Sequence, residues 1–164
     1  MSSSDLALLN HKFLSSEICE DLVKELEELH PARWVRRTEM HKLRATTSDA
    51  SCQYSTSANK SLGTEMQEKL LNLAPTIEKH RVAEVVINRY LPGDFISKHL
   101  DRAIFYVYNM TIALQTGTDG VEIEGIKYPD VAGNGVVFRG PGLEHSVPPV
   151  TNKRYTLIYL YEHD

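Results

Sequence analysis

The second half of the chain alternates short runs of β-branched and aromatic residues with clusters of turn-forming residues. The runs lie at residues 82–90, 107–115, 121–128, 135–140 and 154–161. The clusters between them are rich in Pro, Gly, Asn and Asp, which favour tight turns. Many short strands joined by turns predict a β-sandwich or a barrel for this half of the chain.

The first half shows helical patterns instead. Residues 16–30 carry apolar side chains at helical spacing with carboxylates opposite, and residues 62–80 predict a second helix that ends near Pro75. The polar and partly basic segment 33–61 between them predicts a short strand and a mobile loop, and its part 45–61 is a candidate lid. The sequence therefore predicts an α+β fold with N-terminal helices packed on one sheet.

Length and composition limit the function. The 164 residues suit one domain, and a formal net charge of −4 argues against tight non-specific DNA binding. Cys19 and Cys52 are too few for a disulfide scaffold, and the N-terminus lacks a long apolar core. No apolar run is long enough to span a membrane. We expect a cytoplasmic protein, or a nuclear one in a eukaryote, that is not secreted.

A candidate metal site begins after the run at 82–90. His99 and Asp101 are two residues apart, and side chains at i and i+2 of an extended chain point to the same face. This spacing aims a ring nitrogen and a carboxylate at one point. An H-x-D pattern is common by chance, so its meaning depends on the rest of the chain.

Two more residues strengthen the pattern. His145 follows a Pro-Gly turn, and Arg154 follows it nine residues later at the start of the apolar closing run. Alternation places Arg154 on one face with Thr156, Ile158 and Leu160, so an inward-facing Arg154 would be a buried cation that needs an anionic partner. The partner is either a structural carboxylate or a bound one.

Two histidines and one carboxylate form the facial triad of non-haem iron, which leaves three coordination positions open. These positions suit a bidentate 2-oxo acid and dioxygen. A guanidinium further in can hold the distal carboxylate of that acid. Asn88 and Tyr90 share a strand face and could donate to the same molecule.

The residues above resemble those of the Fe(II)/2-oxoglutarate-dependent dioxygenases. Residues 88–102 are similar to the AlkB-type segment, and residues 145–161 and 12–26 resemble the prolyl hydroxylases. The positions that fall at matching AlkB-type spacing are Asn88, Tyr90, Pro92, Gly93, His99 and Asp101. The resemblance implies a double-stranded β-helix (jelly roll), with 1–164 as a single domain, 1–81 as helical support and lid, and 82–164 as catalytic core.

The resemblance also implies a cofactor set. His99, Asp101 and His145 would ligate Fe(II). Arg154 would pair with 2-oxoglutarate, assisted by Tyr90 and Asn88, and O2 would be the oxidant with ascorbate as an optional reductant. The implied reaction hydroxylates a substrate C–H bond and releases succinate and CO2.

The residues at the expected substrate site match these families less well than the residues at the expected cofactor site. AlkB-type repair enzymes carry an R-x-N-x-x-x-R-like strand, whereas this chain has Thr156 and Leu160 at the last two of those positions. Only Gly120 and the acidic and apolar residues after it resemble the Gly-Gly-Glu-Leu-like strand that prolyl hydroxylases often show.

Three functions remain open. A peptidyl side chain, as in prolyl hydroxylases, is the favoured substrate. A nucleic-acid base oxygenase is an alternative, supported by a basic cluster around Trp34 that could bind phosphates, although a solvated strand edge protected by charge is the favoured interpretation of the cluster. The cluster consists of Arg33, Arg36, Arg37, Lys42 and Arg44. The third function is a non-catalytic jelly-roll binding module.

Overall fold

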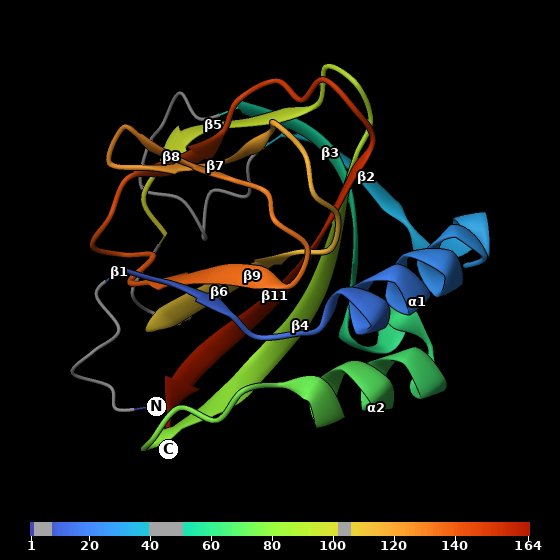
Figure 1. The fold of residues 1–164 in the computed structure, drawn as a ribbon, viewed down its shortest axis with the longest axis horizontal. Helices are drawn as coiled ribbons and strands as arrows, with labels where there is room; N and C mark the ends of the chain where they lie inside the picture. The colour runs from blue at the N-terminus through green and yellow to red at the C-terminus, as the bar shows by residue number, and fades with distance from the viewer. Residues whose placement is uncertain (2–7, 40–50, 102–105) are drawn as a thin grey trace.

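The computed structural model describes residues 1, 8–39, 51–101 and 106–164. Two α-helices and eleven β-strands make up the fold (Figure 1). The helices are α1 (Ser16–Glu27) and α2 (Thr64–Leu73). The strands are β1 (Leu8–Lys12), β2 (Val35–Glu39), β3 (Ser51–Ala58), β4 (His80–Tyr90), β5 (Phe95–His99), β6 (Tyr108–Ala113), β7 (Gly120–Ile123), β8 (Ile126–Pro129), β9 (Asn134–Phe138), β10 (His145–Val147) and β11 (Arg154–His163).

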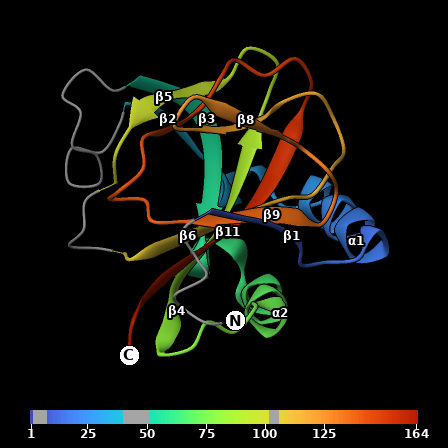
Figure 2. The same ribbon diagram turned by 60° about the vertical axis from the view of Figure 1, so that its left-hand side comes forward.

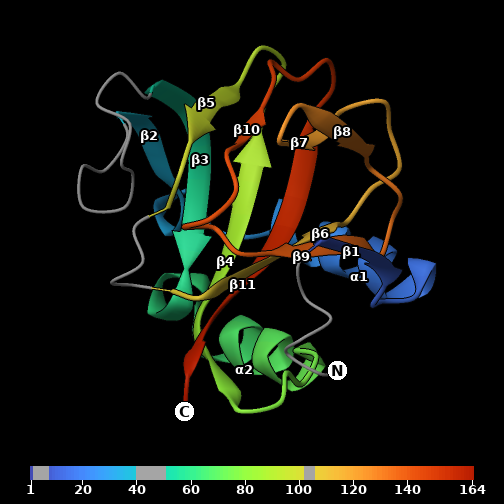
Figure 3. The ribbon, with the colours of Figure 1, turned by 90° about the vertical axis from the view of Figure 1, so that its left-hand side faces the viewer.

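The strands form one curled antiparallel sheet that folds over on itself. Its order is β1-β9-β6-β11-β4-β3-β5-β10-β7-β8, with β2 paired to β3. Strands β5, β10, β7 and β8 lie in one layer, which we call the minor sheet, above the layer of β1, β9, β6, β11 and β4, which we call the major sheet (Figures 1 and 3). Strand β3 pairs with β5 at its start and with β4 further along, so it joins the two layers.

Alternation along β11 divides the fold into two environments. Tyr155, Leu157 and Tyr159 are buried in the core that the helices complete on the outer face of the major sheet (Figure 2). Residues of the opposite parity include the buried Arg154 and the partly exposed Ile158, and both line a cavity between the layers. The predicted jelly roll is therefore confirmed, and the face of β11 that carries Arg154 points inward.

Helix α1 begins where the sequence indicates. The Ser15 side chain accepts a hydrogen bond from the Ile18 backbone N–H at 3.2 Å, which caps the helix. Cys19, Leu22 and Leu26 are buried on its inner face. The second helix ends at Leu73, two residues before Pro75, as proline geometry requires.

The prediction for residues 45–61 is wrong where the structure can test it. Residues 51–58 form the regular strand β3, with Ser55, Thr56 and Ser57 buried. The polar composition suggested a loop, but hydroxyl side chains are compatible with a strand that has partners on both sides. Residues 45–50 lie outside the described residues.

One predicted strand is a hairpin. Residues 121–128 contain β7 and β8, joined by Glu124 (φ 50°) and Gly125 (φ 77°). Two consecutive positive φ angles are typical of a type I′ turn, in which glycine is favoured.

Among the described residues, no helix is both long and apolar enough to cross a membrane.

Candidate metal centre and adjoining cavities

The structure brings His99, Asp101 and His145 together. His99 ends β5 and pairs directly with His145 at the start of β10, and their ring centroids are 4.2 Å apart. The Nε2 atoms of both histidines lie 3.4 Å from Asp101 Oδ1. The ligand atoms of the three residues all lie within 4.8 Å of one another, as a shared ion requires.

Backbone hydrogen bonds orient both histidine rings. Nδ1 of His99 lies 2.8 Å from the Ser97 carbonyl oxygen, and Nδ1 of His145 lies 2.8 Å from the Leu143 carbonyl oxygen. Because a carbonyl can only accept, each Nδ1 carries a proton, and Nε2 is the nitrogen of each ring that faces Asp101. An Nδ1–H held by a backbone carbonyl leaves Nε2 as the ligand atom when a metal binds.

The charges of the cluster also suit a cation. Burial raises the pKa of Asp101, but hydrogen bonds and charge interactions with His145 and His99 outweigh it and hold the pKa well below its usual range. Burial lowers the pKa of His99, whereas Asp101 and the Ser97 carbonyl raise it, with a net increase. An ionised carboxylate between two imidazoles is a donor set that binds divalent iron.

Gly140 lies against the Asp101 carboxylate. The Asp101 backbone N–H donates to the Gly140 carbonyl oxygen at 3.0 Å. A Cβ atom at Gly140 would lie 2.1 Å from Asp101 Oδ2, which is closer than non-bonded atoms approach. Glycine is therefore required for this carboxylate position, a constraint that the spacing of His99 and Asp101 does not reveal.

Arg154 is buried and paired. Its Nε and Nη2 donate to Asp130 Oδ2 and Oδ1 at 2.6 and 3.1 Å, and the two side chains are 5% and 7% exposed. Its Nη1 is buried without a hydrogen-bond partner. The sequence is compatible with a structural or a bound carboxylate as the partner; the structure contains a structural one, Asp130, and leaves one guanidinium nitrogen for a bound one. Asp130 itself was missed, because it lies in a turn cluster 24 residues from Arg154.

Tyr90 and Asn88 lie beside this arginine. The Arg154 guanidinium carbon is 4.9 Å from the centre of the Tyr90 ring, and the Tyr90 hydroxyl accepts a hydrogen bond from Asn88 Nδ2 at 3.3 Å. Both side chains are buried, and Asn88 Oδ1 has no partner. The two side chains are therefore placed to donate hydrogen bonds to the oxygen atoms of a ligand that binds beside Arg154.

A cavity of about 140 Å³ connects the two groups. His99, Asp101 and His145 line it together with Asn88, Tyr90 and Arg154, and apolar side chains from both layers complete its walls. Arg154, whose Nη1 has no partner, and the His-Asp-His cluster therefore border one space. A small acid that binds a metal at one end and a guanidinium at the other fits these residues.

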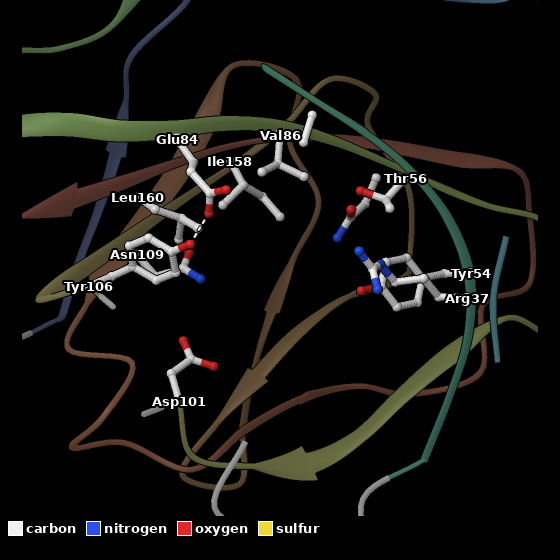
Figure 4. A pocket seen from close by; sticks show the side chains of 12 residues that line it. Arg37, Tyr54, Thr56, Glu84, Val86, Asp101, Tyr106, Asn109, Ile158 and Leu160 are labelled. Atoms are coloured by element: carbon white, nitrogen blue, oxygen red, sulfur yellow. Dashed lines mark hydrogen bonds between the residues drawn. The ribbon is translucent and has the colours of Figure 1, made fainter. Parts of the chain in front are cut away.

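A second cavity of about 290 Å³ lies on the other side of Asp101. Figure 4 shows Arg37 and Tyr54 on one side of it and Glu84 on the opposite side. The Glu84 carboxylate accepts hydrogen bonds from the Tyr106 hydroxyl and, at 3.2 Å, from Asn59 Nδ2. Val86, Ile158 and Leu160 add apolar surface, so this cavity could hold a mixed polar and apolar group next to the metal centre.

The described residues of the predicted basic cluster have different neighbours. Arg36 donates two hydrogen bonds to the buried Asp94, at 2.6 and 2.7 Å, whereas Arg37 lines the second cavity. Arg33 lies beside Gly63, near the N-terminus of α2. Trp34 packs in the core, with its ring 4.4 Å from the Arg89 guanidinium. Lys42 and Arg44 lie outside the described residues.

Comparisons with known proteins identify the fold. No protein-family model matches the chain, and no curated protein matches it. A solved prolyl-4-hydroxylase of Pseudomonas putida is similar over 98% of this chain and 95% of its own, with a TM-score of 0.65 and 20% identity. The viral collagen prolyl hydroxylase of Paramecium Bursaria Chlorella virus-1, solved as a 2-oxoglutarate complex, covers 98% of both chains with a TM-score of 0.61 and 14% identity.

A third solved structure has a different chemistry. The non-haem α-ketoglutarate-dependent epimerase SnoN from nogalamycin biosynthesis is similar over 96% of this chain and 78% of its own, with a TM-score of 0.65 and 10% identity. At sequence identities this low, structural similarity shows the fold and does not determine the reaction. The chain therefore has the double-stranded β-helix fold that these prolyl hydroxylases and the epimerase share.

Proposed function

We propose that the protein is an Fe(II)- and 2-oxoglutarate-dependent dioxygenase that hydroxylates a substrate C–H bond. The observation that carries this proposal is the cavity bordered by His99, Asp101 and His145 at one end and by Arg154 at the other. The fold, which this chain shares with a prolyl hydroxylase solved with 2-oxoglutarate, supports the same function.

One group of residues would bind the metal, and another would bind 2-oxoglutarate. His99, Asp101 and His145 would hold Fe(II) and leave coordination positions for other ligands. Arg154 Nη1 and the Tyr90 hydroxyl bind the distal carboxylate of 2-oxoglutarate. Bound iron and 2-oxoglutarate supply the activation of O2, in which 2-oxoglutarate is oxidised to succinate and CO2 while one oxygen atom enters the substrate.

The protein must also limit the access of water to the reaction and provide space for the substrate. Walls such as Ile96, Val121 and Phe138 limit water in the smaller cavity. The larger cavity adjoins Asp101 and offers room for the substrate group that is to be oxidised. Ascorbate is an optional reductant of the iron and has no assigned site.

A peptidyl side chain, prolyl or similar, is the substrate that we favour. Its support is the similarity to two prolyl hydroxylase structures across nearly the whole chain. A nucleic-acid base oxygenase is the alternative; within its supporting cluster, Arg36 pairs with Asp94 and the Trp34 ring packs near Tyr155. Mass spectrometry on proline-containing peptides and methylated oligonucleotides separates the two by gain of one oxygen atom or loss of a methyl group.

The cofactor chemistry is tested first by an anaerobic titration of metal-free protein with Fe(II) and 2-oxoglutarate. A 2-oxo acid chelated to iron gives a visible charge-transfer band. We expect the band in the wild type and its loss in His145→Ala. Absence of the band in folded wild-type protein would favour the third function, a non-catalytic binding module.

A further inference from the structure

The buried Asp130 determines which atoms of Arg154 a ligand can reach. Asp130 occupies Nε and Nη2 of the guanidinium, and Nη1 is its remaining nitrogen, buried without a partner. Arg154 lines both the cavity of the candidate metal centre and a smaller neighbouring space, whereas Asp130 lines only the smaller space. A ligand in the cavity therefore meets one guanidinium nitrogen rather than the two that an unpaired arginine offers a carboxylate.

Asp130 also balances the charge of Arg154. Both side chains are almost fully buried, so little solvent screens their interaction. A ligand carboxylate attracted to Arg154 is repelled by Asp130 from further away. Because the energy between charges falls with distance, the repulsion offsets part of the attraction.

The Tyr90 hydroxyl supplies a second donor on the cavity side. It already accepts a hydrogen bond from Asn88 Nδ2, so its own proton is available for donation. Tyr90 is 2% exposed and lies under the guanidinium of Arg154. One N–H and one O–H are thus available to a ligand oxygen at this end of the cavity.

We propose that Asp130 is a positioning residue that sets the selectivity of the site for its 2-oxo acid. By holding two nitrogens of Arg154 and balancing its charge, Asp130 restricts recognition of the distal carboxylate to Arg154 Nη1 and the Tyr90 hydroxyl. The site then discriminates less strongly between 2-oxo acids with and without a distal carboxylate than an unpaired arginine would. This inference rests on the proposed function.

The test compares two acids on three Fe(II)-loaded proteins by anaerobic titration calorimetry. The acids are 2-oxoglutarate and 2-oxopentanoate, which has the same chain length but ends in a methyl group. The proteins are the wild type, Asp130→Asn and Asp119→Asn. Asp119→Asn is the matched control, because it removes an equal charge from an aspartate that binds Thr151 rather than Arg154.

We expect Asp130→Asn to raise the ratio of the two dissociation constants, 2-oxopentanoate over 2-oxoglutarate, by roughly tenfold, the effect of about one charged hydrogen bond. Asp119→Asn should leave the ratio within about twofold of the wild type, because the Asp119 carboxylate binds Thr151 and Asn152 rather than Arg154, although its charge also acts on Asp130. Because Asn keeps the size of Asp and one acceptor oxygen, a purely structural role would weaken both acids equally. An unchanged or lowered ratio in Asp130→Asn overturns the inference.

A second variant leaves the buried ion pair of Arg154 and Asp130 unchanged. Tyr90→Phe removes the other proposed donor, so it should weaken 2-oxoglutarate by roughly tenfold and change 2-oxopentanoate little. Equal affinities of Tyr90→Phe and wild type for 2-oxoglutarate contradict the two-donor site, even where Asp130→Asn fails to fold. If the wild type binds neither acid, the proposed function fails and the inference fails with it. If it binds both but the ratios do not move, the inference alone fails.

Discussion

The backbone carbonyl of Gly140 accepts a hydrogen bond from the backbone N–H of Asp101 at 3.0 Å, and the glycine Cα faces the Asp101 carboxylate. The loop after β9 therefore fixes both the backbone and the side chain of a candidate metal ligand. The two residues are linked in space although 38 positions separate them in the sequence.

Replacing Gly140 by alanine should displace this carboxylate. The new Cβ would lie 2.1 Å from Oδ2, so the carboxylate must move. We expect Gly140→Ala to weaken Fe(II) or Ni(II) binding by about tenfold or more, measured by anaerobic titration. Gly142→Ala is the control, because its Cβ would lie 3.7 Å from the nearest atom, in Arg139. Equal metal affinity of the two variants would show that Asp101 does not depend on this contact.

Arg154→Ala should separate acid binding from metal binding. We expect it to weaken 2-oxoglutarate binding strongly and leave Fe(II) affinity near the wild-type value, since Arg154 contacts Asp130 rather than the His-Asp-His cluster. The variant also leaves Asp130 buried without its partner, which costs about 3–5 kcal/mol of stability.

The double variant Arg154→Ala/Asp130→Ala controls for that loss of stability. It removes both buried charges, so it should unfold less readily than Arg154→Ala while binding 2-oxoglutarate no better. Calorimetric titration of both variants measures the affinities, and denaturant unfolding measures the stabilities. Unchanged 2-oxoglutarate affinity in either variant would disprove the role of Arg154.

The Arg36–Asp94 pair gives a pH-dependent contribution to stability. Burial raises the pKa of Asp94, but hydrogen bonds from Arg36, the Leu91 backbone N–H and Gln53 outweigh it and lower the pKa below the ordinary 3.8. The ionised form is therefore favoured by folding. Its contribution is complete above the unfolded pKa and disappears as the pH falls through the lower folded pKa.

Asp94→Asn measures this contribution. We expect the wild type to exceed the variant by about 1–3 kcal/mol at neutral pH, a range for hydrogen bonds to a charged group. The half-exposed Arg36 is screened by solvent and contributes toward the lower end. The difference should shrink once the pH falls below about 4. Urea unfolding across the pH range checks it, and a gap that does not change with pH contradicts the assignment.

Tyr159 caps the C-terminal end of α2. Its hydroxyl donates to the Leu70 carbonyl oxygen at 2.5 Å, where the last carbonyls of a helix lack partners within the helix. We expect Tyr159→Phe to lower the free energy of unfolding by about 1–2 kcal/mol, because the buried carbonyl loses its donor. Tyr128→Phe, on β8 and away from this contact, should change it by under about 0.5 kcal/mol. Equal losses for both would argue against a specific cap.

The features that the sequence reveals best depend on neighbouring residues or on the regular alternation of side chains along a strand. Alternation along 154–161 grouped Arg154 with Thr156, Ile158 and Leu160 on one face, and the H-x-D spacing placed Asp101 near His99, because period-2 geometry determines which side chains share a face. The hairpin at Glu124 was missed because the apolar residues on both sides formed one continuous run. The strand at Ser51–Ala58 was missed because its stability comes from partners on both sides rather than from its own composition.

Features that depend on distant contacts were not predictable. Asp130 lies in a turn cluster, and only the folded chain shows it next to Arg154. Gly140 is one of nine glycines, and nothing in the sequence marks it as the one against Asp101. The basic residues around Trp34 are close in sequence, yet strand alternation sends Arg36 and Arg37 to different sides of β2.

The candidate metal ligands and Arg154 belong to different layers of the fold. His99 and His145 lie on β5 and β10 of the minor sheet, whereas Arg154 lies on β11 of the major sheet. An acid held at both ends joins the two layers, and its binding free energy adds to the stability of the folded chain. Cells that run short of that acid would then hold a protein that opens more often and is degraded sooner, so its abundance would follow the supply of its own ligand.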